Sequence, residues 1–168
     1  MEERIQQLIK GFTDGLSSLK DLVEELPREE AYDSGYDAAH AALAPIAWSK
    51  AVGDRLDTSK AQDLLGITRQ ALAKRVASGS LLGLPGKGTT YYPSWQFDSL
   101  ARTIRPEARE ILRIFSERGE DDHYMIATWM TTPNRDLDET SPARWLEDGK
   151  EMNRLLEAAQ QVAERWSS

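Results

Sequence analysis

The sequence of 168 residues contains no cysteine and only two histidines, His40 and His123. The lack of cysteine excludes a disulfide framework, a thiolate metal site and a cysteine nucleophile. No window approaches the roughly 18 consecutive apolar residues that a membrane-spanning helix needs. The acidic, amphipathic start Met1–Arg4 is unlike a secretory signal. We therefore expect a cytoplasmic protein that binds no metal, no cofactor and no membrane.

Catalytic signatures are also scarce. The glycine-rich stretch 83–88 matches neither a phosphate-binding loop nor a dinucleotide fingerprint, because it lies between short strands and precedes no helix. The run Glu120-Asp121-Asp122-His123 is expected to be a solvated turn, since adjacent side chains rarely converge on one ion. No serine or threonine has an identifiable histidine partner. The sequence therefore predicts a binding protein and not an enzyme.

The net charge of −7 is unevenly distributed along the chain. Residues 55–105 carry eight basic and three acidic side chains, hence +5, whereas residues 1–54 and 106–168 carry −6 each. A basic segment between acidic flanks indicates an anionic partner for the middle of the chain; the alternative is a chance excess of solvated cations. The same divisions mark three expected parts: a helical N-terminal segment 1–54, a DNA-binding domain 55–105 and a helical domain 106–168.

Residues 2–26 are predicted to form one helix that ends at Pro27. Its apolar side chains follow a seven-residue repeat at Ile5, Leu8, Phe12, Leu19, Leu22 and Leu26, with Gly15 in the remaining position. Such a stripe must be covered, either by a second copy in a homodimer or by the rest of the same chain, and both alternatives stay open. Residues 28–34 are expected to be a connector and 36–43 a helix. Pro45 either breaks this helix or opens a following one that runs towards Arg55.

Residues 57–77 carry the signature of a helix-turn-helix motif. Asp57-Thr58-Ser59 offers N-caps for a helix over 60–65, Gly66 allows a tight turn, and Thr68 caps a second helix over 69–77. In this motif the second helix presents its first residues to base edges. The DNA-contacting candidates on it are Thr68, Arg69, Gln70, Lys74 and Arg75.

Two short runs, 81–84 and 89–92, flank the turn 85–88 and predict a β-hairpin. A hairpin directly after a helix-turn-helix is a wing, and Lys87 at its tip is a candidate phosphate contact. Trp95 and Phe97 are expected to be core anchors. A DNA-binding domain is the leading interpretation, and a helix-turn-helix kept as a protein-interaction module is the alternative.

The run Leu64-Leu65-Gly66-Ile67-Thr68-Arg69-Gln70-Ala71-Leu72, followed by Tyr92-Pro93-Ser94-Trp95-Gln96-Phe97-Asp98, resembles the small MerR- or excisionase-like DNA-binding domains of bacterial regulators. The resemblance covers residues 57–98. It implies a winged helix-turn-helix that binds double-stranded DNA.

Helices are predicted to begin at Pro106, near Tyr124 and at Ser141-Pro142, and a last helix follows Gly149. The series Trp129-Met130-Thr131-Thr132-Pro133-Asn134, Leu137, Ser141-Pro142-Ala143, Leu146 and Gly149 resembles the toxin-binding domain of the Xre/MbcA/ParS antitoxins, over residues 120–168. One departure is that Asp138-Glu139-Thr140 replaces glycines common at those positions.

This second resemblance implies a mainly α-helical antitoxin that neutralises a RES-type toxin, an NAD-degrading enzyme, and represses its own operon. It points to Trp129, Pro133, Asn134, Arg165 and Trp166 as partner-binding residues, with the inhibitory contact at the last two. Trp166 is equally well explained as the last core residue of its helix, and Trp129, Pro133 and Asn134 as residues that define the fold. Two other functions stay open: a stand-alone transcription regulator or DNA-organising protein whose C-terminal domain self-associates, and an adaptor without DNA contact.

Overall fold

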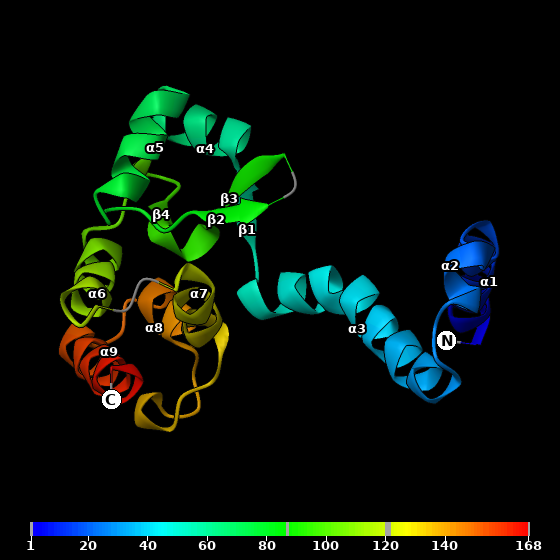
Figure 1. Cartoon of the computed structure of the whole chain (residues 1–168). Helices are drawn as coiled ribbons and strands as arrows, with labels where there is room; N and C mark the ends of the chain where they lie inside the picture. The colour runs from blue at the N-terminus through cyan, green and yellow to red at the C-terminus, as the bar shows by residue number, and fades with distance from the viewer. Residues whose placement is uncertain (1, 87, 120–121, 168) are drawn as a thin grey trace. The chain divides into compact units, whose positions relative to one another are not determined.

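The structure is a computed structural model that describes residues 2–86, 88–119 and 122–167. It is mainly helical with a small antiparallel sheet, as the sequence predicted (Figure 1). The chain divides into two compact units, Met1–Ile46 and Ala47–Ser168. None of the helices in the described ranges is long and apolar enough to cross a membrane.

The first unit contains α1 (Glu2–Ser18), α2 (Lys20–Glu24) and most of α3 (Arg28–Val52). The prediction of one helix over 2–26 is wrong, because the helix is interrupted at Leu19, where φ is −113° and ψ is 25°. The hydroxyls of Ser17 and Ser18 donate to the carbonyls of Thr13 and Gly15. Such bonds compete with the helical pattern and often bend a helix, which explains a break here.

Helix α3 also differs from the sequence prediction. The expected connector over 28–34 is helical, and Pro45 lies inside the helix without ending it. Glu29 and Glu30 occupy the first turn, where negative charge is favourable to the helix dipole. Alanine, the strongest helix former, occupies five of the seven positions from 38 to 44, and this propensity offsets the single backbone bond that a proline removes.

The second unit begins with a winged helix-turn-helix. Its elements are β1 (Arg55–Asp57), α4 (Thr58–Leu65), α5 (Arg69–Ala77), β2 (Leu84–Gly86) and β3 (Thr89–Pro93). The sheet is antiparallel in the order β1-β3-β2, with Leu56 opposite Tyr92 and Pro85 opposite Thr90. The predicted hairpin is confirmed, although its first strand starts at Leu84 and not at Leu81. Strand β1 was not predicted, since three residues give too short a pattern.

The rest of the unit follows the wing. It consists of η1 (Ser94–Gln96), β4 (Phe97–Asp98), β5 (Thr103–Ile104), α6 (Pro106–Glu117), α7 (His123–Thr131), η2 (Arg135–Leu137), α8 (Pro142–Glu147) and α9 (Met152–Trp166). The helix starts predicted at Pro106 and at Ser141-Pro142 are confirmed. The predicted last helix after Gly149 is confirmed as α9, whose inward side buries Leu155, Ala159 and Val162.

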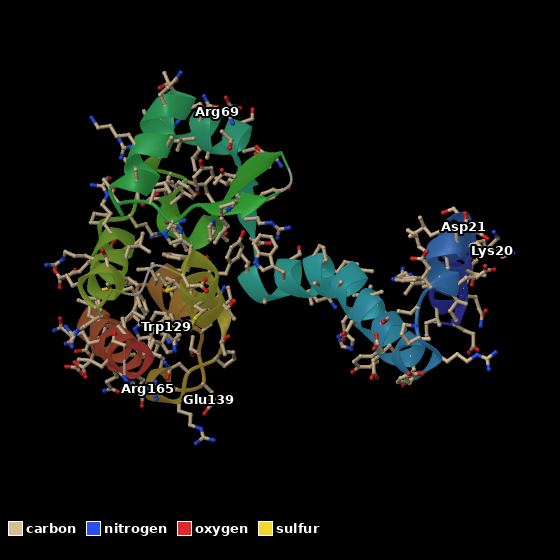
Figure 2. The ribbon with its side chains drawn as sticks, in the orientation of Figure 1. Lys20, Asp21, Arg69, Trp129, Glu139 and Arg165 are labelled. Atoms are coloured by element: carbon tan, nitrogen blue, oxygen red, sulfur yellow. The ribbon has the colours of Figure 1, made fainter. Side chains whose placement is uncertain are left out.

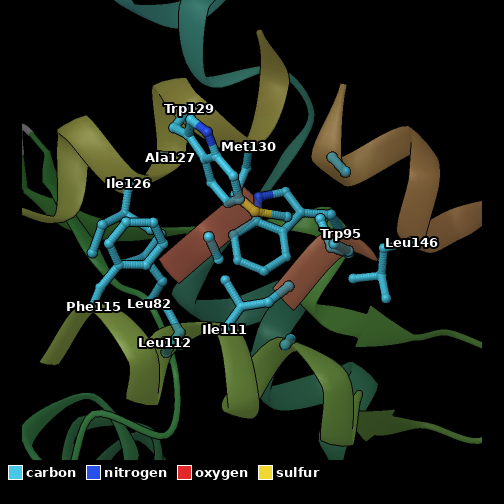
Figure 3. Packing of buried hydrophobic residues seen from close by; sticks show 14 of the residues in the cluster. Leu82, Trp95, Ile111, Leu112, Phe115, Ile126, Ala127, Trp129, Met130 and Leu146 are labelled. Atoms are coloured by element: carbon cyan, nitrogen blue, oxygen red, sulfur yellow. The ribbon is translucent and has the colours of Figure 1, made fainter. Parts of the chain in front are cut away.

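Two hydrophobic cores lie in this second unit. The smaller one lies beneath the helix-turn-helix and contains Ala61, Leu72, Leu81, Tyr92, Phe97 and Ile104. The larger one is formed by α6–α9 but also contains Leu82, Leu84 and Trp95 (Figure 3). The Tyr124 hydroxyl on α7 also donates to the Pro85 carbonyl of β2. Residues 55–105 and 106–168 therefore both contribute to the larger core. The compact unit begins at Ala47, ahead of the boundary expected at 54–55.

Gln96 joins the two cores. Its side chain is fully buried, and its Oε1 accepts from the Leu82 backbone N–H at 2.6 Å. Its Nε2 donates to the carbonyls of Leu82 at 3.0 Å and Pro93 at 3.2 Å. Leu81 and Phe97 enter the smaller core, whereas Leu82 and Trp95 enter the larger one. The amide thus fixes two chain segments that each contribute side chains to both cores.

We predict that Gln96→Met destabilises the protein by about 2–4 kcal/mol, because it leaves the polar groups of Leu82 and Pro93 buried without partners. The melting temperature of the second unit, followed by tryptophan fluorescence, should fall by on the order of 10 °C. Gln160→Met, at an exposed position of α9, is the matched control and should leave the melting temperature unchanged. Equal melting temperatures for the two variants would contradict this role of Gln96.

Candidate functional site

The helix-turn-helix is positioned by local hydrogen bonds. The Asp57 carboxylate accepts from the Lys60 backbone N–H at 2.8 Å and caps α4. Gly66 ends α4 with φ at +65°, a conformation that glycine adopts without strain. The Thr68 hydroxyl accepts from the Ala71 N–H at 3.2 Å and caps α5. All three were predicted, and they fix the start of α5, the candidate recognition helix.

The outer face of α5 carries the predicted DNA-contacting side chains. Leu72 is fully buried on the inner side, and Arg69, Gln70 and Lys74 are exposed. Arg69 lies on the side of α5 away from the larger core (Figure 2). In the part of the chain that the structure describes, neither Arg69 nor Lys74 forms an ion pair. Arg75 is half-buried, and the Thr68 hydroxyl is occupied by its capping bond.

Three of the eight basic residues in 55–105 instead support the fold. The Arg55 guanidinium donates to Ser49 and lies over the rings of Trp48 and Tyr91, at 5.2 and 5.1 Å. Arg102 donates to two carbonyls at the end of α4, with 2.6 Å to that of Asp63. These contacts join distant segments or involve backbone atoms, so a count of charges along the sequence could not find them.

Arg105 is the third of these cations, and its Nε donates to the Phe97 carbonyl at 3.1 Å. Phe97 belongs to the two-stranded sheet β4-β5, whose connecting loop is capped by Asp98. The Asp98 carboxylate accepts from the backbone N–H groups of Leu100 and Ala101. The bond from Ala101 is the main cause that lowers the pKa of Asp98. Arg105 and Asp98 therefore hold the loop and are not available as ligand contacts.

The wing is tied to the first helix of the motif. The Thr58 hydroxyl donates to the Thr90 carbonyl, and the Thr89 hydroxyl donates to that of Thr58. A Cβ atom at Gly86 would lie 2.5 Å from the Tyr91 ring, so this position of β2 accepts only glycine without a shift of the ring. Lys87, the predicted phosphate contact at the tip, lies outside the described residues.

A polar groove of about 440 Å³ lies beyond the last turn of α5. Its lining residues are Ser78, Gly79, Ser80, Arg109, Arg113, Ser116 and Glu117. Arg113 pairs with Glu110 and Glu117, whereas Arg109 is exposed and forms no ion pair within the described ranges. Hydroxyls and a guanidinium suit phosphate oxygens. Sequence reasoning missed Arg109, because it belongs to α6 and comes beside α5 only in the folded chain.

Two of the five predicted partner-binding residues meet in a second, apolar groove. Trp129 and Trp166 both contact the Phe115 ring, with centroids 5.4 Å away in each case. They line a groove of about 440 Å³ together with Tyr124, Met125, Thr128 and Thr132. Trp129 is 8% exposed, and its buried Nε1 has no hydrogen-bond partner among the described residues. Figure 3 shows Trp129 at the edge of the larger core.

The other three partner-binding candidates do not line this groove. The Asn134 side chain accepts from the Asp136 N–H at 2.9 Å and caps η2, as expected of a residue that defines the fold. Pro133 is exposed in the preceding loop, and Arg165 is exposed near the end of α9 (Figure 2). Trp166 is half-buried, so it belongs both to the edge of the core and to the groove wall.

The loop at 138–139 contains two residues other than glycine with positive φ. Asp138 and Glu139 have φ values of +55° and +57°, in the region that favours glycine. Asp138 is held there by Arg154, whose guanidinium contacts both carboxylate oxygens at 2.6 and 2.9 Å. The hydrogen bond from Arg154 is the main cause that lowers the pKa of Asp138. Glycine would fit the backbone that the loop adopts at these two positions.

We predict that Glu139→Gly stabilises the second unit by about 0.5–1 kcal/mol, because it relieves the left-handed conformation. Glu139→Ala is the matched control: it removes the same charge but keeps the Cβ atom, and it should give no gain. Denaturant unfolding followed by tryptophan fluorescence measures both. A glycine variant no more stable than the alanine variant would show that position 139 is unstrained.

No candidate metal centre lies within the described ranges, where no three His, Asp or Glu side chains gather. The predicted turn 120–123 is only partly described. Asp122 caps α7 by accepting from the N–H groups of Tyr124 and Met125. His123 Nδ1 lies 2.9 Å from the Gly83 carbonyl. The two residues of this run that the structure describes are thus used to position α7.

Comparisons with known proteins show a similarity of fold but no match to a protein family. No protein-family model and no curated protein matches the chain. The chain is similar to the NMR structure of Rv2175c, with a TM-score of 0.56 and 20% sequence identity. The match covers 66% of this chain and 81% of that one. At this identity the similarity concerns the fold.

Proposed function

We propose that this protein is a transcription regulator that binds double-stranded DNA in the cytoplasm through α5. The observation that carries the proposal is the outer face of this helix, where Arg69, Gln70 and Lys74 are exposed and without ion pairs within the described residues. A capped helix start and a buried Leu72 hold these groups in place. Arginine suits the guanine edge, glutamine the adenine edge, and lysine a phosphate.

Further cations are placed to contact the phosphate backbone on either side of α5. Lys60 is exposed in the first turn of α4, an end of the motif that lies close to the backbone when the second helix enters the major groove. Arg109 is exposed in the polar groove beyond the C-terminal end of α5. In this proposal they extend the contact made by α5, in a chain of net charge −7. The acidic residues outside this contact would weaken non-specific DNA binding, so that the affinity would depend on the specific contacts.

Alanine substitutions on α5 test this function against a duplex selected from a random pool. Arg69→Ala should raise the dissociation constant about 10- to 100-fold and relax the preference at one base pair, because a base contact is lost. Lys74→Ala and Arg109→Ala should each weaken all duplexes alike and lower the slope of log K against log salt by about one. Fluorescence anisotropy at several salt concentrations measures these effects.

Arg135→Ala provides the control, since Arg135 is an exposed cation of η2 outside the proposed interface. It removes the same charge and should leave both the dissociation constant and the salt slope unchanged. If the natural protein binds no duplex at low salt, the DNA-binding function is wrong and the helix-turn-helix serves protein contacts.

A second candidate function, the antitoxin, is favoured by the apolar groove. Trp129 and Trp166, which the antitoxin resemblance points to, line one opening together with exposed Tyr124 and Met125. Exposed apolar side chains around a groove are typical of surfaces that bind a protein partner. In this proposal the groove receives apolar side chains of a cognate RES-type toxin, and α5 binds the promoter of the shared operon.

A charge placed in the groove tests this partner site. Met125→Glu should abolish co-purification with a neighbouring RES-type toxin and the rescue of growth on co-expression, because a carboxylate would be buried at the contact. It should leave DNA binding intact, since Met125 is 40% exposed and no residue that lines its groove belongs to α4 or α5. Gln161→Glu, at an exposed position of α9, is the control. Unimpaired rescue by Met125→Glu would exclude the groove as the toxin site and favour the stand-alone regulator.

A further inference from the structure

The first unit contains helices but no core of its own. Among residues 2–46 no side chain is buried. Seven large apolar side chains of α1, α2 and the break between them are 40–64% exposed: Ile5, Leu8, Ile9, Leu16, Leu19, Leu22 and Val23. We call these seven residues the N-terminal apolar surface. Helices of this length are marginal in water without tertiary packing, so the surface requires a cover.

The part of the surface on α1 has the geometry of a helix-docking face. Ile5, Ile9 and Leu16 recur at the spacing of one helical face, and the helix is 17 residues long. Beside them runs a groove of about 530 Å³, lined by Gln7, Leu8, Gly11, Phe12, Gly15, Leu16, Ser18 and Leu19. A Cβ atom at Gly11 or Gly15 would meet nothing within 4 Å. The small residues therefore leave open space in which a second helix can approach closely.

Two possible covers fit the surface poorly. The second unit exposes only three large apolar side chains in its described residues, Leu100, Tyr124 and Met125, too few to match seven. A membrane surface is disfavoured, because residues 2–26 carry six acidic and three basic side chains, and helices that lie on anionic lipid are rich in lysine and arginine.

A second copy of the same helices matches the N-terminal apolar surface in both chemistry and size. A two-fold axis pairs identical patches, so an apolar patch on one copy meets an equal patch on the other. At roughly 50 Å² of apolar surface per half-exposed side chain, two copies would remove about 700 Å² from water. Homodimer interfaces are about 65% apolar, so the full interface approaches about 1,100 Å², close to the lower bound of about 1,200 Å² for stable pairs.

We propose that the N-terminal apolar surface is the interface of a homodimer of this chain. The proposal does not depend on DNA binding, because it rests on the exposed side chains of α1 and α2 alone. The estimated area of the interface lies at the lower end of the range for specific protein interfaces.

Sedimentation equilibrium of the full chain without DNA, from about 1 to 200 μM, tests the proposal. The natural protein should reach twice the monomer mass of 18.9 kDa. Ile9→Glu with Leu16→Glu should raise the dimer dissociation constant on the order of a hundredfold or more, because both apolar positions are lost from each copy. Gln6→Glu with Thr13→Glu adds the same charge at the same spacing outside the apolar stripe, and should still dimerise.

Ile9→Ala with Leu16→Ala separates loss of the interface from loss of the helix, since alanine keeps helix propensity high. This variant should also dissociate more readily than the natural protein. A natural protein that stays monomeric at 200 μM overturns the proposal and leaves a foreign protein as the cover. If neither double variant changed the dimer dissociation constant, the contact would lie elsewhere and the proposal would also be wrong. Duplex binding measured in parallel by anisotropy separates either result from a failure of the DNA-binding function.

Discussion

The second unit depends on the side-chain amide of Gln96. A polar group at the centre of a hydrophobic unit is tolerated only when its donors and acceptors are satisfied, and here the oxygen and the nitrogen both have backbone partners. Each bonded segment sends neighbouring side chains in opposite directions, Leu81 and Phe97 into one core and Leu82 and Trp95 into the other. The position of the helix-turn-helix relative to α6–α9 follows from this arrangement, and so does the placement of Arg109 near the end of α5.

The sequence predicted the features whose causes are local. The caps at Asp57 and Thr68 and the proline after Ser141 act within three or four residues, so their signatures can be found along the chain. The exposure of Arg69 and Lys74 follows from helical periodicity once Leu72 faces inward. The polar groove beside Arg109 and the apolar groove beside Trp129 each bring together residues that are far apart in the sequence, and no short sequence pattern contains this information.

Sequence reasoning failed where two local tendencies compete or where the partner is remote. Pro45 disfavours a helix and its alanine neighbours favour one, and only the structure shows that the helix continues. A charge count treats Arg55 like Arg69, yet the guanidinium of Arg55 packs over the rings of Trp48 and Tyr91 and that of Arg69 is exposed. Residues 55–105 therefore carry a net positive charge, but only some of their cations are exposed to a possible ligand.

The division into two units has a spectroscopic consequence. All five tryptophans, at positions 48, 95, 129, 145 and 166, belong to the unit Ala47–Ser168, whereas Tyr32 and Tyr36 belong to the first unit. Indole fluorescence excited near 295 nm therefore reports on one unit alone, and the far-ultraviolet helical signal reports on both. A denaturation curve recorded with both probes on the natural chain will show whether the units melt together. Coincident curves would mean that the coreless helices are coupled to the packed unit, and separated curves that each unit unfolds independently.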